Sequence, residues 1–446
     1  MTPSSDAAPT FLVCIAGPDA GKRIAVNDQT ITIGRSSACE ALSGDPEVAE
    51  RHLSLRLEGG QMKFAVTGAA KSFVDGQPLN EGTLSPRQQL RVGRSLWQLE
   101  GGQSSRDFSN LLGDIGGRIS EVAGVERIEG FKLSAMFSEV WRRRTDDELE
   151  NYFAAGTPTT TPALADIDTN WPKPWLFFKT FTLAALVYAG FVFAFDRFNN
   201  ALVLPGLVTI GAFVIPFTLL IFFFEVNAPR NVPLYQLVKL LFLGGVLSLI
   251  LSLFLFEWTR LSSWLGAMSA GLVEETGKAA ALLLVVNKLK YRWMLNGLLF
   301  GAAVGAGFAA FESAGYAFLA GADHGQSAML NNITVRGVLS ICGGHVLWTA
   351  LVGGALWRVR GAERFSWHLL GDARFLRVFG MCAVMHMLWN SPLRLPFYLK
   401  YIALGFVAWV ALLSFIQAGL RQIRAAQATG ATEFFAKLKQ DAGGTP

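Results

Sequence analysis

The chain has 446 residues, of which 51% are hydrophobic and only 16% are charged. A soluble protein of this length typically carries about 25% charged residues, so the composition argues against disorder, a collagen-like fibre and a purely soluble enzyme. The net charge of +5 is too small and too dispersed to indicate nucleic-acid binding. The four cysteines form no C-x-x-C pair and no metal-finger spacing, so the sequence predicts no disulfide framework.

The apolar residues are unevenly distributed along the chain. Residues 1–170 have the composition of a soluble protein, whereas residues 175–420 are markedly apolar. The first apolar run, Phe11 to Ala16, is too short for a signal peptide and has no basic segment before it. We therefore expect the first part of the chain to stay in the cytoplasm.

Residues 11–100 have the pattern of an all-β domain. Short runs with alternating or β-branched residues are separated by clusters of Gly, Asp, Pro and Asn. Such regular spacing predicts a small β-sandwich within residues 1–100.

Four motifs in this domain resemble those of forkhead-associated (FHA) domains. They are Ile33-Gly34-Arg35, Glu50-Arg51-His52, Ser72-Phe73-Val74-Asp75-Gly76 and Val92-Gly93-Arg94. The resemblance implies a phosphothreonine-binding fold in which Arg35 matches the phosphate-binding arginine and His52 the scaffold histidine. The usual serine and asparagine of such a site are replaced by Ala49 and Ala70. Because a phosphate needs several charge-assisted donors together, we expect an interaction module with weak phosphothreonine binding.

Residues 101–170 are predicted to form an amphipathic juxtamembrane linker. One helical face would carry Leu133, Met136, Phe137, Val140 and Trp141, followed by Arg142, Arg143 and Arg144. Such a helix suits either a cytoplasmic membrane surface or packing against the protein itself, and both interpretations stay open. The Thr- and Pro-rich run at residues 156–165 is expected to be extended.

Eight apolar segments follow, and most reach the ~20 residues that span a bilayer. They lie near residues 176–195, 202–224, 234–256, 262–286, 293–320, 337–358, 376–391 and 397–419. This pattern predicts a polytopic α-helical membrane bundle of about eight transmembrane helices.

The distribution of basic residues distinguishes the two sides of the membrane. One side carries Arg142 to Arg144, Lys173, Lys288, Lys290, Arg292, Arg358, Arg360, Arg364, Arg374, Arg377, Arg421, Arg424, Lys437 and Lys439. The opposite loops are poorer in charge and carry Arg197, Arg260, Arg336, Arg394 and Lys400. The positive-inside rule therefore predicts an inner-membrane or cell-membrane protein with both termini, including a tail at 426–446, in the cytoplasm. Labelling a single cysteine at position 199 from each side of the membrane would test this topology.

Ionisable residues inside the apolar segments are candidates for function because they are costly in a membrane. The polar positions in question are Glu274, Glu275, Lys278, Glu312, His345, His386 and Asn390. At ~1.5 Å of rise per helical residue, these positions on four segments fall in one layer, at the centre of the membrane or slightly towards its outer face. A shared depth predicts one site.

The spacing of these residues suits acid–base chemistry. Glu274 precedes Lys278 by four residues, the favourable order for a helical ion pair. Two adjacent carboxylates beside a lysine would have split pKa values and would supply a general base and a general acid. His386 and Asn390 would present two donors on one helix face, as an oxyanion hole requires. Each pair alone is equally typical of structural contacts between helices.

Three ordered motifs resemble the PrsW family of intramembrane proteases, which looks related to the CAAX prenyl proteases. They are E-E-x-x-K from Glu274 to Lys278, F-x-x-x-E from Phe308 to Glu312 and H-x-x-x-N from His386 to Asn390. The resemblance extends over about residues 160–425, and also includes the run from Arg336 to Ala350. It implies a glutamate-dependent peptidase without an obligatory metal, whose membrane-embedded substrates include anti-sigma factors. The CAAX relatives have His where this chain has Glu312, so their water-activating pair does not transfer directly.

We therefore predict a two-part protein: an FHA-like domain in the cytoplasm and, at residues 171–425, an intramembrane endopeptidase. Its site residues would be Glu274, Glu275 and Glu312 for water activation, His386 and Asn390 for the oxyanion, His345 for water or substrate, and Lys278 and Phe308 in support. The expected partners are a membrane-protein substrate, the lipid bilayer and a phosphoprotein or other protein ligand of the FHA-like domain, with Arg35 as the candidate phosphopeptide-binding residue.

Two other classes of function use the same residues. A transporter or proton pathway would also place Glu, Lys and His at mid-membrane. A catalytically silent receptor would use only the FHA-like domain. Within the protease class, a divalent ion held by Glu312, His345 and His386 is an alternative that chelator sensitivity would distinguish.

Overall fold

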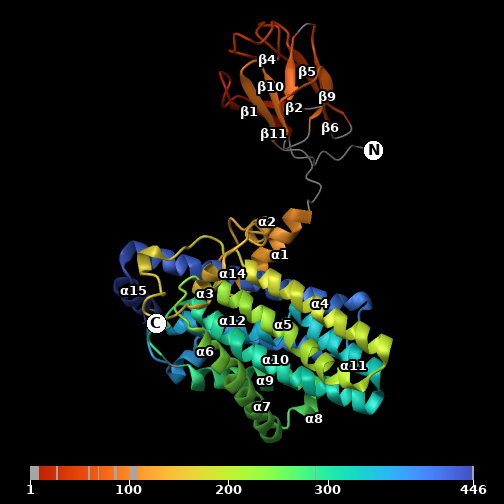
Figure 1. Cartoon of the computed structure of the whole chain (residues 1–446). Helices are drawn as coiled ribbons and strands as arrows, with labels where there is room; N and C mark the ends of the chain where they lie inside the picture. The colour runs from red at the N-terminus through yellow and green to blue at the C-terminus, as the bar shows by residue number, and fades with distance from the viewer. Residues whose placement is uncertain are drawn as a thin grey trace. The chain divides into compact units, whose positions relative to one another are not determined.

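The computed structural model describes residues 10–26, 29–58, 61–68, 70–84, 88–100, 108–286 and 288–443. These residues form two compact units, residues 1–111 and residues 112–446 (Figure 1). Each unit is described by itself.

The first unit is a β-sandwich, as the sequence predicts. One sheet contains, in spatial order, β2 (Arg23–Val26), β1 (Thr10–Ala16), β11 (Ser95–Glu100), β10 (Gln89–Val92), β7 (Ser72–Val74) and β8 (Gln77–Pro78). The other contains β4 (Ala41–Leu42), β3 (Ile31–Gly34), β5 (Leu53–Glu58), β6 (Gln61–Val66) and β9 (Glu81–Leu84). Alternate residues such as Leu53 and Leu55 point into a core that also holds Leu12, Leu90 and Trp97.

The segment that follows contains three short helices: α1 (Phe108–Val122), α2 (Leu133–Met136) and α3 (Asp146–Phe153). The predicted amphipathic helix through residue 141 is wrong, because α2 ends at Met136 and Trp141 is 90% exposed. Instead, Arg144 stacks on the ring of Trp175, with 3.7 Å between its Cζ and the ring centroid. A new helix then begins at Thr145, whose side chain caps α3. Tertiary contacts and a capping signal thus override helical periodicity.

This segment packs on the protein, one of the two arrangements that the sequence left open. Ser120 Oγ lies 2.7 Å from Ser414 Oγ. The Gln417 amide donates to the carbonyl oxygen of Arg127 at 2.6 Å and accepts from the backbone N–H of Glu129 at 2.5 Å. The run at 156–165 forms turns and a short 3₁₀ helix (Leu164–Asp166) rather than an extended strand.

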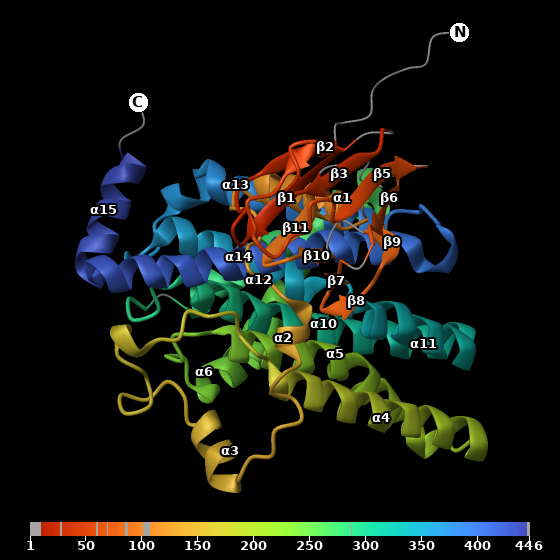
Figure 2. The same cartoon turned by 90° about the horizontal axis from the view of Figure 1, so that it is seen from above.

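The rest of the second unit is a helical bundle. Its long helices are α4 (Trp175–Phe198), α5 (Leu204–Val226), α7 (Gly245–Thr259), α9 (Ala270–Val285), α10 (Met294–His324), α12 (His345–Arg360), α13 (Ala373–Asn390) and α14 (Leu399–Thr429). Shorter helices are α6 (Leu234–Lys239), α8 (Ser262–Leu265), α11 (Gln326–Asn332) and α15 (Ala431–Gly443). Figures 1 and 2 show α11 at one end of the bundle and α3 and α15 at the other. The predicted tail at residues 426–446 is largely helical where the structure describes it, since α14 runs to Thr429 and α15 follows. Phe435 of α15 is buried.

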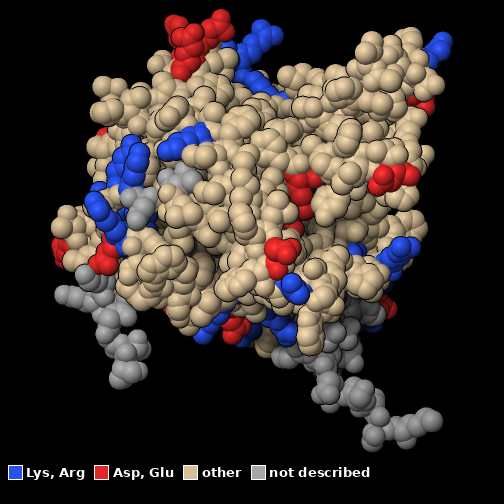
Figure 3. Space-filling view, turned by 90° about the horizontal axis from the view of Figure 1, so that it is seen from below, with Lys and Arg blue, Asp and Glu red and all other residues tan. Residues whose placement is uncertain are grey.

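Among the described residues, six helices are long and apolar enough to cross a membrane. They are Trp175–Phe198, Ala201–Val226, Leu234–Thr259, Met294–His324, Gln326–Arg360 and Pro396–Thr429. Helices also form at the other two predicted segments, but α9 has only 16 residues and α13 starts with Arg374 and Arg377, so the predicted count of eight spans is not confirmed. On the face in Figure 3, charged side chains are sparse, as a lipid-facing surface requires.

Glycines bring α10 and α12 into close contact, as their four-residue spacing predicts. A Cβ added at Gly301 would overlap the carbonyl oxygen of Thr349, and one at Gly297 would overlap that of Gly353. Small residues of this kind allow membrane helices to approach backbone to backbone. The contact fixes α12, which begins at His345, against α10, which carries Glu312.

We expect Gly301→Ala to destabilise the bundle by about 1–3 kcal/mol, because the added methyl group forces the two backbones apart. Gly315→Ala on the same helix is the matched control: nothing lies within 4 Å of its added Cβ. Alanine is also the better helix former by about 1 kcal/mol. Thermal unfolding in detergent measures both variants, and equal melting temperatures for Gly301→Ala and wild type would contradict the close packing.

Candidate active site

Four helices converge on one cluster of ionisable side chains. Helix α9 supplies Glu274, Glu275 and Lys278, and α10 supplies Glu312. His345 is the first residue of α12, and His386 lies one turn before the end of α13. Of the seven polar residues singled out from the sequence, the structure brings these six together.

Three of the four helices present the cluster near one of their ends. Gly266, with a φ of +55°, interrupts the helical run and α9 begins four residues later. Ahead of His345 the backbone changes from a π-helix (Ile333–Val338) to a 3₁₀ turn (Leu339–Ile341) and an extended Gly344. Irregular backbone at membrane depth is tolerated only where protein or a water-filled cavity surrounds it. The cluster therefore sits at breaks between helices rather than along uninterrupted spans.

Glu275 and Lys278 form a fully buried ion pair. Lys278 Nζ lies 2.6 Å from Glu275 Oε1 and 3.9 Å from Glu274 Oε2, so the predicted pairing of Lys278 with Glu274 is the weaker contact. His386 Nδ1 also lies 3.0 Å from Glu275 Oε1. Glu275 thus neutralises a buried cation and fixes the orientation of an imidazole, which leaves its Oε1 engaged twice.

Glu312 makes a second set of ion pairs. Its Oε2 lies 2.9 Å from His345 Nε2 and also contacts the guanidinium of Arg336. Arg336 was assigned to an outer loop from the sequence, but it lies in the π-helix between α11 and α12, with its guanidinium 4.2 Å from the ring centroid of Tyr316. An arginine is costly within an apolar run, and this cost could have marked Arg336 as a site residue. It did not, because the predicted sixth segment begins at residue 337, one residue after it.

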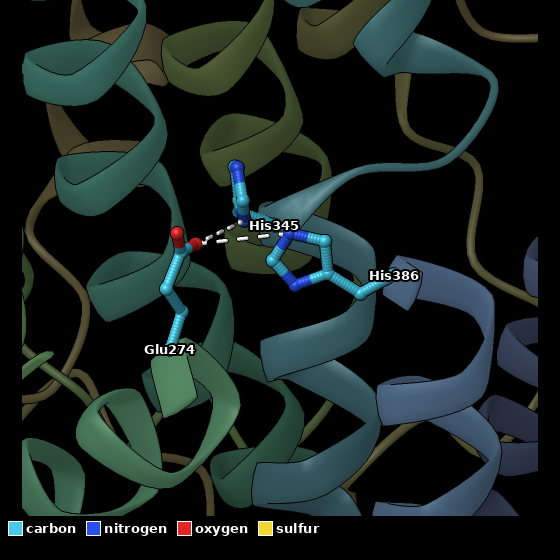
Figure 4. Close-up of side chains that lie close together, drawn as sticks. All are labelled: Glu274, His345 and His386. Atoms are coloured by element: carbon cyan, nitrogen blue, oxygen red, sulfur yellow. Dashed lines mark ion pairs between the residues drawn. The ribbon is translucent and has the colours of Figure 1, made fainter. Parts of the chain in front are cut away.

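The remaining carboxylate, Glu274, faces both histidines (Figure 4). Its Oε2 lies 3.7 Å from His386 Nε2 and 4.0 Å from His345 Nδ1. This oxygen is buried and has no hydrogen-bond partner among the described residues. Each imidazole contacts a different carboxylate through one nitrogen, and its other nitrogen lies within 4.0 Å of Glu274. That nitrogen of His345, Nδ1, is also 2.8 Å from Lys278 Nζ.

The same three residues have the donor set of a catalytic metal site. One ligand atom each from Glu274, His345 and His386 lie within 4.8 Å of one another. Two histidines and one glutamate hold the zinc ion of several hydrolases. The structure groups Glu274 with the two histidines, whereas the sequence-based alternative placed Glu312 there.

The two other predicted site residues differ in their surroundings. Phe308 is buried against the cluster, with its ring centroid 5.0 Å from that of His345 and 4.3 Å from Lys278 Nζ. Asn390 is the last residue of α13, and among the described residues no hydrogen bond or ion pair joins it to the cluster. Asn390 lies one turn after His386 on α13, and the donor pair of these two residues stays a prediction.

The β-sandwich carries a separate pocket of about 840 Å³. Arg35, Ala49 and Ala70 all line it, together with Lys71, Arg91 and Arg94. His52 also lines the pocket and is largely buried. Its Nδ1 accepts from the backbone N–H of Ala49 at 3.1 Å, and its Nε2 lies 3.1 Å from the carbonyl oxygen of Lys71. Burial lowers the pKa of His52 and keeps the ring neutral, as this scaffold role requires.

Comparison with known proteins gives two family matches. Residues 216–416, which contain the whole cluster, match the PrsW family of intramembrane metalloproteases. Residues 14–103 match the cytoplasmic domain of the inner-membrane component of the type III secretion system.

The β-sandwich is also similar to individual proteins. The glycogen accumulation regulator GarA of Mycolicibacterium smegmatis is 30% identical over 102 residues, which cover 22% of this chain and 65% of GarA. The oxoglutarate dehydrogenase inhibitor of Corynebacterium jeikeium is 29% identical over 85 residues, 19% of this chain and 59% of that protein. The chain therefore spans less than two thirds of these relatives. The FHA domain of CT664 from Chlamydia trachomatis is 18% identical, with a TM-score of 0.20, over 21% of this chain and 96% of that structure.

The two adjacent glutamates are expected to differ in their effect on stability. Glu275→Gln leaves Lys278 as a buried charge without its close partner, a loss that typically costs about 3–5 kcal/mol. Glu274→Gln keeps that pair and should leave the melting temperature in detergent close to that of wild type. Glu257→Gln, at an exposed position of α7, is the control for loss of a carboxylate. Equal destabilisation by the two substitutions would contradict the assigned pairing.

Proposed function

The chain carries a PrsW-family intramembrane protease domain at residues 216–416 behind an FHA-like domain, and from this premise we propose that the Glu274 cluster hydrolyses peptide bonds of membrane proteins. The observation that supports this proposal is the unpaired, buried Oε2 of Glu274, which faces two histidines that are themselves oriented by carboxylates. A carboxylate held in this way is suited to bind a water molecule and accept its proton.

The proposed reaction uses the groups of the chain in two steps. Glu274 takes a proton from water while the water oxygen bonds to the carbonyl carbon, and the π-electron pair moves onto the carbonyl oxygen. The carbonyl then re-forms, the C–N bond breaks, and Glu274 returns its proton to the leaving nitrogen. The products are a carboxylic acid and an amine, and Glu274 is restored.

The other two glutamates and their partners position this chemistry. Glu275 holds His386 through Nδ1, and Glu312 holds His345 through Nε2. Arg336 and Lys278 compensate the charges of these two carboxylates. Glu274 is thereby the one glutamate of the cluster that lacks a close ion pair.

The donor set fits the metal ion that the family description implies. Glu274, His345 and His386 would hold a divalent ion, which would supply Lewis acidity and lower the pKa of a bound water. His345 Nδ1 lies 2.8 Å from Lys278 Nζ. An ion bound to this nitrogen would therefore compete with Lys278.

The decisive experiment is cleavage of synthetic transmembrane peptides by purified protein in detergent. The peptides carry a fluorophore and a quencher on either side of a Leu- and Ala-rich core interrupted by Gly and Pro. We expect Glu274→Gln to reduce the rate by about 10²–10⁴-fold, because glutamine cannot accept the proton. Cleavage at the wild-type rate by folded Glu274→Gln protein would refute the assignment.

The same assay with a chelator tests whether cleavage needs a divalent ion. We expect removal of divalent ions, verified by elemental analysis, to stop cleavage and added Zn²⁺ to restore it. We also expect His386→Gln to lower the amount of bound ion independently of activity. Full activity of verified metal-free protein would show that the carboxylate works alone.

For the FHA-like domain we propose a protein-interaction role with weak affinity for phosphothreonine. Ala49 and Ala70 line the pocket beside Arg35 but supply no side-chain hydrogen bond. A hydrogen bond to a charged group contributes about 1.5–3 kcal/mol, so two missing bonds weaken binding by roughly 10²-fold or more.

Restoring the missing donors tests that interpretation. In titrations of the full chain with a phosphothreonine peptide library, we expect no micromolar binding by wild type. The double variant Ala49→Ser, Ala70→Asn should gain phosphate-dependent affinity, and Arg35→Ala added to it should remove the gain. Micromolar binding by wild type that requires Arg35 would contradict the proposal and would make phosphorylation a control of the protease.

A further inference from the structure

Trp348 lies inside the cluster and has no role in the reaction described so far. It is one turn after His345 on α12 and is 1% exposed. Its ring stacks on His386, with centroids 4.7 Å apart and an interplanar angle of 26°, and meets His345 edge-on at 5.6 Å. Trp389 closes a further side at 5.8 Å. The indole is thus in direct contact with both histidines that face Glu274.

The indole N–H of Trp348 is buried without a hydrogen-bond partner. In the described part of the second unit it is the one fully buried indole N–H of this kind. Trp357 donates to the carbonyl oxygen of Tyr291 at 2.7 Å, and Trp409 donates to that of Ile341 at 2.8 Å. Buried indole N–H groups usually find an acceptor, and one without a partner carries a desolvation penalty. An unpaired donor in a catalytic cluster therefore calls for an acceptor that arrives with the substrate.

We propose that the Trp348 N–H donates a hydrogen bond to the carbonyl oxygen of the scissile peptide and stabilises the negative charge that develops there. This inference rests on the proposed peptidase function. Hydrolysis needs a preorganised donor at the oxyanion. His386 Nδ1 is engaged with Glu275. An indole N–H is only a donor, so no change of tautomer can remove it.

A purely structural role for Trp348 predicts a different result. If the ring only stacks on His386, then phenylalanine, which keeps an aromatic face, preserves activity. If the N–H binds the developing oxyanion, then phenylalanine removes catalysis while the fold is kept. Because the N–H has no partner among the described residues, its removal leaves no acceptor unsatisfied, and a fall in melting temperature would come only from the smaller ring.

The test compares Trp348→Phe with Trp357→Phe on the fluorogenic transmembrane peptides described above. For Trp348→Phe we expect kcat per folded molecule to fall by about 10²–10³-fold, with KM nearly unchanged and a fall in melting temperature no larger than that of Trp357→Phe. For Trp357→Phe we expect the opposite pattern: a lower melting temperature, because Tyr291 loses a donor, and an unchanged kcat per folded molecule.

The outcomes separate this inference from the function on which it rests. If wild type and Glu274→Gln both fail to cleave the peptides, the proposed peptidase function is refuted. If wild type cleaves, Glu274→Gln does not, and Trp348→Phe cleaves at the wild-type kcat, only the role of Trp348 is overturned. A fall in kcat that is matched by loss of folded protein, or an effect confined to KM, would overturn it equally.

Discussion

The ammonium group of Lys278 is the constraint on which the site depends. It is fully buried, and an unpaired charge in such a place would cost several kcal/mol. Glu275 compensates it at 2.6 Å, and the same carboxylate oxygen then fixes His386. Lys278 also contacts His345 and lies over the ring of Phe308. One buried cation therefore determines which glutamate, Glu275, makes the close ion pair and fixes His386.

The bundle also holds residues 112–170, which precede its first long helix. Helix α14 directs a polar face to this segment at Ser414 and Gln417. A partly buried carboxylate, Glu225, accepts from the backbone N–H groups of Leu176 and Phe177 in the first turn of α4. Glu225 also accepts from the hydroxyl of Tyr152 in α3 at 3.0 Å. A carboxylate at a helix N-terminus is stabilised by the helix dipole, so one residue secures both α4 and α3. The linker is thereby part of the membrane unit rather than a free tether.

The cluster residues could be predicted from the sequence because ionisable residues in apolar segments are few. Placing a charged side chain in a membrane costs free energy in any protein, so each such residue is a candidate. That argument found Glu274 and His386 on different helices without any knowledge of their contacts. It missed Arg336, because an arginine at the edge of a predicted segment looks like a loop residue until the π-helix places it beside Glu312. It also could not rank Glu274 against Glu275: neighbours in sequence point to different sides of a helix, and only packing decides which one meets Lys278 closely.

The position of Glu312 can be understood in the same terms. A second carboxylate beside Glu274 would raise the cost of ionising either one. The structure offsets that charge with Arg336 and uses Glu312 to hold His345 through Nε2. The opposite nitrogen of His345 then faces Glu274 at 4.0 Å. Glu312 and Arg336 together thus hold His345, the first residue of α12, beside Glu274.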